Sequence, residues 1–206
     1  MVLHQLAGRG INDSKVLQAF REVPREVFVP EPVKEHAYQD SPLSIGSGQT
    51  ISQPYIVALM TELLEVKPGD KVLEVGTGSG YQAAILLKME AKVYGVERYS
   101  NLAKEAKEKI TALGYTIKIK IGDGTLGWRE FAPFDKIVVT AAAPKAPQSL
   151  LEQLTVGGKL VIPLGSRFSQ EITIVEKRAK DEFSSKAVCG CVFVPLIGEE
   201  GWNELA

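Results

Sequence analysis

The apolar side chains near the N-terminus recur at helical spacing. Asp13 is a good N-cap because its carboxylate can accept hydrogen bonds from the free amides of a first helical turn. The apolar positions that follow are Val16, Leu17, Phe20 and Val23. Prolines at 24 and 30 then interrupt the pattern. The pattern predicts one amphipathic helix followed by an irregular tether.

Residues 41–54 are rich in Gly, Ser, Thr and Pro and show no hydrophobic period, which predicts a polar loop. Pro54 suits the first turn of a helix, where its missing N–H is not needed. The apolar positions of that helix are Ile56, Val57, Leu59, Met60, Leu63 and Leu64. We therefore expect residues 1–65 to form an N-terminal helical extension, with an active-site loop, packed on a main domain of residues 66–206.

Short apolar runs alternate with helical patterns from residue 66 onward. The predicted strands are 71–75, 91–96, 116–121, 136–140 and 159–163, and residues 100–113 are a clear example of an intervening helix. This alternation is typical of a parallel sheet covered by helices on both faces. The main domain is therefore predicted to be a doubly wound α/β unit.

The last third of the chain breaks this rhythm. Two further strands are predicted at 171–176 and 187–196, and the links before them are shorter than the dozen or so residues that a helical crossover needs. Both strands should therefore pair antiparallel with their neighbours. With strands numbered along the chain, we predict a seven-stranded mixed sheet in the order 3-2-1-4-5-6-7.

A glycine-rich turn follows the first strand of the main domain. It reads Gly76-Thr77-Gly78-Ser79-Gly80 and leads into a helix. Glycines at such a turn let the backbone approach a ligand, and the helix start offers free amide donors. The third glycine comes one residue earlier than in the dinucleotide fingerprint, which disfavours pyrophosphate. We predict a nucleoside-like ligand bound by Gly76, Thr77, Gly78 and Gly80.

Carboxylates stand near three consecutive strand ends. Glu97 lies 21 residues after Gly76, where it can accept from both ribose hydroxyls. Asp123, followed by Gly124, can accept from an exocyclic amine at the same sheet edge. Glu74, just before the glycines, adds a negative charge that favours a cation over a phosphate. Singly each could be a turn or surface residue, but together they point to a sulfonium nucleoside.

Charge and composition narrow the function classes. The 206 residues include 24 basic and 25 acidic side chains, so the formal net charge is −1. With this balance, no strong positive electrostatic field is expected to attract nucleic acid or anionic lipid. No apolar run approaches the roughly 18 residues of a membrane span. No secretory signal is recognisable at the N-terminus. We expect a cytoplasmic protein that acts as a monomer, without nucleic-acid or membrane partners.

Metal binding is not expected. Cys189 and Cys191 share one face of a predicted strand, and the two histidines, His4 and His36, lie far from them without ligand-like spacing. The cysteines are therefore interpreted as small side chains buried in a strand.

Several segments resemble known methyltransferase motifs. LEVGTGSGY, GVER, GDG and LTVGGKLVIP are similar to successive motifs of Rossmann-like S-adenosylmethionine methyltransferases. PREVFVP at 24–30, GSGQTISQP at 46–54 and VFVPL at 192–196 narrow the resemblance to the protein-L-isoaspartate O-methyltransferase family. The resemblance covers nearly the whole chain, and GQTISQP is its most specific element.

This resemblance implies methyl transfer from S-adenosylmethionine to the free carboxylate of L-isoaspartyl residues in damaged proteins, which begins their repair and leaves S-adenosylhomocysteine. The family's active-site serine maps onto Ser52, and the Thr50 hydroxyl could help orient the carboxylate. Without the resemblance, Ser52 would be interpreted as a helix cap. Thr140 is expected to contact the cofactor, where the small residues that follow it leave room for a ligand. Val194 lies where backbone groups could contact a bound peptide.

Two alternatives remain at the level of sequence. One is a nicotinamide-dependent reductase, which shares the strand-glycine-helix turn, and the other is a noncatalytic nucleoside-binding protein. A serine hydrolase is not supported, because Ser79 lacks the flanking Gly-x-Ser-x-Gly pattern. Binding of S-adenosylmethionine would separate the reductase from the methyltransferase, and the GQTISQP segment argues against a noncatalytic binder.

Overall fold

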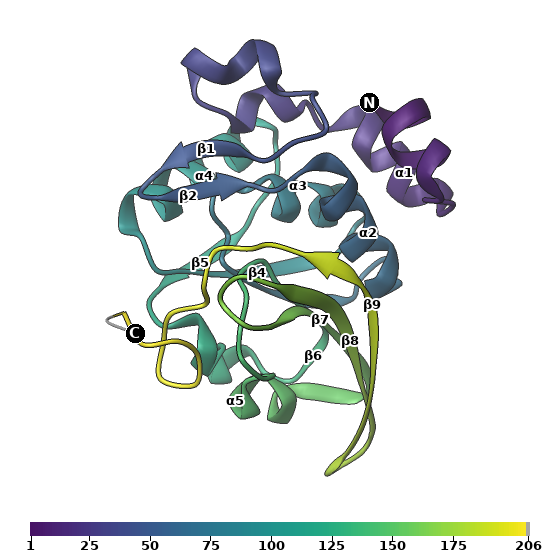
Figure 1. Ribbon diagram of the computed structural model, residues 1–206, viewed down its shortest axis with the longest axis vertical. Helices are drawn as coiled ribbons and strands as arrows, with labels where there is room; N and C mark the ends of the chain where they lie inside the picture. Colours follow the sequence, from purple (N-terminus) through teal and green to yellow (C-terminus); the bar gives the residue numbers. More distant parts are fainter. Residues whose placement is uncertain (205–206) are drawn as a thin grey trace.

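A seven-stranded mixed sheet forms the centre of the computed structural model, which describes residues 1–204 (Figure 1). Its strands are β3 (Lys71–Val75), β4 (Lys92–Glu97), β5 (Lys118–Ile121), β6 (Phe134–Val139), β7 (Leu154–Gly165), β8 (Gln170–Ala179) and β9 (Glu182–Cys191). The spatial order is β5-β4-β3-β6-β7-β8-β9, parallel from β5 to β7 and antiparallel for β8 and β9. The predicted order is confirmed, and both β7 and β8 extend beyond their predicted bounds.

Helices cover the two faces of the sheet because side chains along each strand alternate in direction. On one face Val72, Val138 and Val161 are buried in a cluster with apolar residues of the first four helices. These are α1 (Ser14–Glu22), α2 (Pro54–Leu64), α3 (Tyr81–Lys88) and α4 (Ser100–Ala112). On the other face Leu73 and Ile137 pack with a second cluster that includes residues of α5 (Gln148–Glu152).

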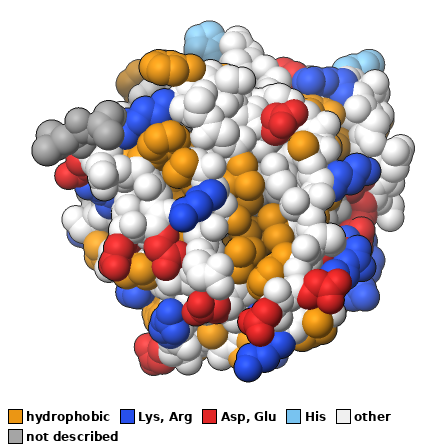
Figure 2. All heavy atoms as spheres, turned by 60° about the horizontal axis from the view of Figure 1, so that its bottom comes forward, with side chains coloured by type: hydrophobic (Ala, Val, Ile, Leu, Met, Phe, Trp, Pro, Cys, Tyr) orange, Lys and Arg blue, Asp and Glu red, His pale blue; other side chains and the backbone are white. Residues whose placement is uncertain are grey.

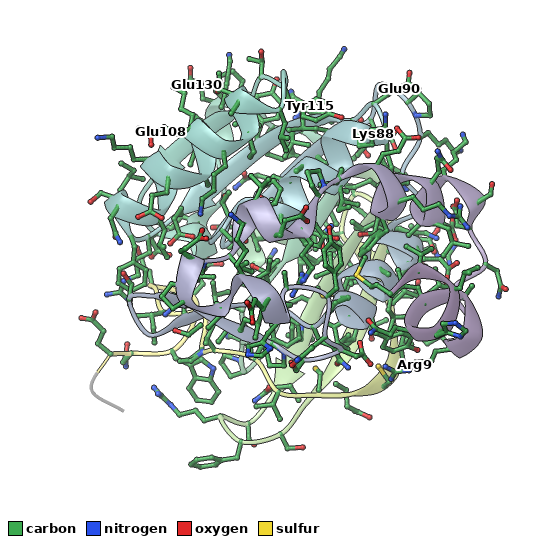
Figure 3. The ribbon with its side chains drawn as sticks, turned by 90° about the horizontal axis from the view of Figure 1, so that it is seen from above. Arg9, Lys88, Glu90, Glu108, Tyr115 and Glu130 are labelled. Carbon is green, nitrogen blue, oxygen red and sulfur yellow. The ribbon has the colours of Figure 1, made fainter. Side chains whose placement is uncertain are left out.

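The predicted helix after Asp13 is confirmed as α1, which packs in the first of these cores, while the predicted irregular tether contains 3₁₀ turns. The Asp13 carboxylate caps α1 by accepting from the amides of Lys15 and Val16 at 2.7 and 3.2 Å. A π-helical turn over Val2–Leu6 precedes it, and further 3₁₀ turns occur at Ala7–Arg9, Arg25–Phe28, Glu31–His36, Gly124–Leu126 and Arg129–Phe131. In the view from above, the purple N-terminal segment lies on the side of the molecule that faces the viewer, with Arg9 near its edge (Figure 3).

The prediction that residues 41–54 form a polar loop without regular structure is wrong. The segment contains a short antiparallel hairpin of β1 (Leu43–Gly46) and β2 (Gln49–Ile51). Ile45 and Ile51 are buried and anchor the hairpin on the first core. The polar composition hides this alternation because the turn interrupts it after only a few residues.

The last predicted strand, 187–196, is also displaced. The strand β9 begins at Glu182 and ends at Cys191. It starts early as a mostly exposed edge strand, which carries no hydrophobic pattern to detect. It ends early because the amide of Phe193 donates to the side-chain oxygen of Gln170 at 2.9 Å instead of to a backbone carbonyl of a neighbouring strand. Pro195 has no N–H to donate to a strand ladder.

Within the described residues, no helix is long and apolar enough to cross a membrane. Figure 2 shows basic and acidic side chains interspersed over one face, in keeping with the near-zero net charge.

Cys189 and Cys191 are half-buried free thiols on β9 rather than fully buried ones, since β9 lies at the edge of the sheet.

Candidate active site

The carboxyl ends of β3 and β6 are joined by a hydroxyl. Thr140 donates to the carbonyl of Gly76 at 2.5 Å, directly after β3, and its Oγ1 also lies 3.1 Å from the carbonyl oxygen of Val75. Gly76 has a φ of +88°, and a Cβ placed there would meet the Thr140 hydroxyl at 2.6 Å. Only glycine fits this turn, which leaves a bare backbone facing the neighbouring cavity.

Glu97 is held rigidly at the end of β4. One carboxylate oxygen accepts from the amide of Gly78 at 2.7 Å and the other from the amide of Tyr99 at 2.9 Å. The side chain is only 5% exposed. Each oxygen retains a lone pair, so the carboxylate is oriented to accept further hydrogen bonds from a ligand.

A first cavity lies along this edge of the sheet. Gly76, Gly78 and Glu97 form one side of it, and Gly124 and Thr140 extend it toward β5 and β6. Residues 194–197 of the C-terminal segment also line it. A cavity with glycine backbone, one fixed carboxylate and apolar walls suits a nucleoside.

A second cavity adjoins the first beneath the glycine-rich turn. It is lined by Glu74 together with Thr77, Ser79 and Gln82. Glu74 is completely buried, and neither of its carboxylate oxygens has a hydrogen-bond partner among the described residues. Burial, and secondarily the charge of Glu97, raises the pKa of Glu74 well above its usual range. A cationic ligand group would complete this site.

A third cavity opens between the β1–β2 hairpin and the end of β9. It is lined by Thr50, Ser52, Ile56 and residues 190–194. Thr50 and Thr140 line all three cavities, and Ser52 lines the second and third. The cavities therefore meet at these hydroxyl-bearing residues, where a bound nucleoside could present a reactive group to a second molecule.

A family model described as protein-L-isoaspartate (D-aspartate) O-methyltransferase matches residues 1–201 of this chain. The chain belongs to this family. The O-methyltransferase 2 of Pelobacter propionicus is 55% identical over 98% of this chain and 91% of its own length. The enzyme of Pelotomaculum thermopropionicum is 52% identical, over 99% of this chain and 90% of its own.

Solved structures of the family share the fold. A crystal structure from Plasmodium falciparum, in complex with S-adenosyl-L-homocysteine, matches with a TM-score of 0.83 and 30% identity, covering 95% of this chain and 96% of that one. A second isoaspartate O-methyltransferase structure matches with a TM-score of 0.86 and 30% identity, over 98% of this chain and 67% of that one. The sheet is therefore the Rossmann-like methyltransferase sheet that the motifs indicated.

Most of the residues proposed from sequence gather around the cavities of this methyltransferase. Gly76, Gly78, Glu97, Gly124, Thr140 and Val194 line the first, and Glu74 and Thr77 line the second. Gly80 is different, because it lies against α4: a Cβ there would approach Ala106 and Ile110 at 3.1 Å. The absence of a side chain at Gly80 allows α3 to pack closely on α4. Its φ of +89° also suits the turn that leads into α3.

Asp123 is engaged by the C-terminal segment. One of its oxygens accepts from the amide and hydroxyl of Thr125 at 2.8 and 2.7 Å. The other accepts from the amide of Glu199 at 2.8 Å. Asp123 lines a neighbouring hollow with Arg98 and residues 197–199, so its predicted contact with a ligand amine stays a prediction.

The sequence does not predict that residues 196–197 of the C-terminal segment line the first cavity. Leu196 and Ile197 line the first cavity because the chain after β9 passes beside Ala142, to which Pro195 forms a parallel bridge. Hydrogen bonds of Ala142 to Val194 and Leu196 hold it there, at 2.8 and 2.7 Å. Its only sequence signal is an apolar run next to proline, which equally suits a strand.

Proposed function

We propose that this chain transfers the methyl group of S-adenosylmethionine to the free carboxylate of L-isoaspartyl residues in damaged proteins. Family membership supports the reaction class. The structural observation that carries the proposal is the meeting of three cavities at Thr50 and Thr140. One cavity suits the nucleoside, one has an unpartnered buried carboxylate, and one opens toward a peptide.

The residues present fit S-adenosylmethionine. Glu97 is oriented to accept from the ribose hydroxyls, and the bare backbone at Gly76 admits the nucleoside closely. Glu74 supplies the negative charge that its cationic part requires. When bound, S-adenosylmethionine supplies an electrophilic methyl group. These residues therefore act by holding and orienting the methyl donor.

The acceptor needs orientation more than activation. An aspartyl-type carboxyl group with an ordinary pKa of about 3.9 is already ionised at pH 7, so no general base is required. Ser52 and Thr50 are placed at the mouth where the cavities join, and we assign them to orient the carboxylate. The capping alternative for Ser52 is not supported, since Gln53 is the N-cap of α2 and no side chain caps that helix.

The peptide is proposed to lie along residues 190–194, which line the third cavity. Val192 is 77% exposed there, and the carbonyl of Val194 is turned inward to the amide of Ala142. Recognition through backbone contacts would accept many flanking sequences. This suits an enzyme whose substrates are damaged proteins of varied sequence. We also infer that the protein works as a monomer in the cytoplasm.

Methyl transfer to a peptide tests this proposal. The purified chain is incubated with methyl-labelled S-adenosylmethionine and a short peptide that contains one isoaspartyl residue. Label should enter the peptide and be released by mild base, because the product is a methyl ester. Binding of S-adenosylmethionine without any transfer would instead support a noncatalytic nucleoside-binding protein.

A further inference from the structure

Arg25 is a buried cation beside the active-site loop, in a segment that the proposed reaction does not use. Its side chain is fully buried, and its guanidinium carbon lies 4.9 Å from the ring centroid of Tyr81. Phe20 and Phe28 pack on the same ring, with centroids 5.8 and 5.5 Å away. An apolar side chain would fill this space without the cost of burying a charge.

The guanidinium connects two segments through their backbones. Its Nε donates to the carbonyl of Ala37 at 2.7 Å, and its Nη2 donates to the carbonyl of Ser52 at 2.7 Å. No carboxylate among residues 1–204 forms a salt bridge with it. The planar fork of arginine can span both carbonyls, whereas the single ammonium of lysine is a point donor.

These contacts reach both sides of the reaction centre. Ser52 lines the second and third cavities, and Tyr81 lines the second. We propose that Arg25 is a positioning residue, which fixes the backbone of Ser52 and so sets the Ser52 hydroxyl against the cofactor cavity. This inference rests on the function proposed above, because it assigns Ser52 to the substrate carboxylate.

The test uses Arg25→Lys, with Arg25→Gln as a second variant in case the first does not fold. Lys177→Met is the matched control. Lys177 is also buried, and it donates to the carbonyls of Leu151, Glu152 and Leu154. These carbonyls lie at the end of α5 and the start of β7. All variants are assayed well below their Tm, so that loss of folded protein does not contribute.

For the Arg25 variants, kcat/KM on an isoaspartyl peptide should fall roughly tenfold to a hundredfold, the effect of losing a charge-assisted hydrogen bond. The Kd for S-adenosylmethionine should change much less than kcat/KM, because the lost hydrogen bond holds the backbone of Ser52, which is assigned to the substrate carboxylate and not to the cofactor. Lys177→Met should lower the Tm and leave kcat/KM unchanged. Full kcat/KM in a folded Arg25 variant, or an equal loss of cofactor affinity, would overturn the proposal.

A double-mutant cycle shows whether Arg25 acts through Ser52. In a Ser52→Ala background, Arg25→Lys should cause little further loss of kcat/KM, since the hydroxyl it positions is gone. Additive losses would contradict the proposal, because they would place the effect of Arg25 elsewhere.

Hydrogen exchange supplies a readout that does not depend on the reaction. Amides of residues 49–53 should exchange faster in the Arg25 variants than in the parent chain, and should be unchanged in Lys177→Met. If the parent chain fails to methylate isoaspartyl peptides, the proposed function fails. Unchanged exchange at 49–53 would overturn the role of Arg25 independently of that result.

Discussion

The buried carboxylate of Glu74 should lower the stability of the ligand-free protein and strengthen binding of the cofactor. Its carboxylate is completely buried without a hydrogen-bond partner, and burial together with Glu97 raises its pKa in the folded chain well above the usual value. The folded state therefore keeps a proton that the unfolded chain loses at a pKa of about 4.3. Unfolding releases this proton, so raising the pH above that value favours the unfolded chain.

The Glu74→Gln variant removes the titration and nearly preserves the shape. Between the unfolded pKa and the raised folded pKa, linkage costs the parent chain about 1.4 kcal/mol per pH unit. The variant should therefore gain stability over the parent as the pH rises from 5 toward 7. In a chain of this size, each pH unit within that interval corresponds to a Tm difference of roughly 3 to 5 °C.

Thermal unfolding of both proteins without ligand, at pH 5 and at pH 7, measures this gap, and calorimetry measures binding of S-adenosylmethionine. The Tm gap should widen with pH, and the variant should bind the cofactor at least roughly tenfold more weakly, having lost a charged partner. The parent should release a proton on binding. A gap that does not change with pH would refute the titration argument, and unchanged affinity would remove Glu74 from the cofactor site.

Three further substitutions test other parts of the site. Glu97→Ala should weaken S-adenosylmethionine binding by about 1.5 to 3 kcal/mol for each lost ribose contact, and unchanged affinity in calorimetry would exclude that role. Ser52→Ala should lower turnover on isoaspartyl peptides roughly tenfold to a hundredfold with cofactor affinity intact, and an unaltered kcat would refute the assignment. Gly80→Ala should destabilise the fold by about 1 to 3 kcal/mol more than Gly114→Ala, because both have a positive φ but only Gly80 faces close neighbours. Equal losses in denaturant unfolding would contradict this packing role.

The sheet could be predicted because its signals are local. The strand β3 is apolar at Val72, Leu73 and Val75, interrupted only by Glu74, and the short links after β7 leave room only for antiparallel neighbours. The β1–β2 hairpin was missed because its apolar alternation is too short to detect between polar residues. The end of β9 depends on one long-range hydrogen bond, donated by the amide of Phe193 to the side-chain oxygen of Gln170, which no local pattern reveals.

The residues of the site likewise fall into those that a local sequence pattern predicts and those that it does not. Gly76 and Glu97 could be found because a glycine turn and a strand-end carboxylate carry their chemistry at a recognisable spacing. The assignment of Ser52 rests on the family resemblance and stays a prediction, since its local pattern suits a helix cap equally well. The contact of Arg25 with the Ser52 carbonyl spans 27 positions of the chain, and only the folded structure brings the two together.

The most direct measurement compares methyl transfer to two peptides of the same sequence, one with an isoaspartyl and the other with a normal aspartyl residue. The isoaspartyl linkage runs the main chain through the side chain, so the same carboxylate stands differently relative to the backbone. If Ser52 and residues 190–194 select this geometry, kcat/KM for the isoaspartyl peptide should exceed that for the aspartyl peptide by orders of magnitude. Equal values for the two peptides, or no methyl transfer to either, would contradict the proposed function.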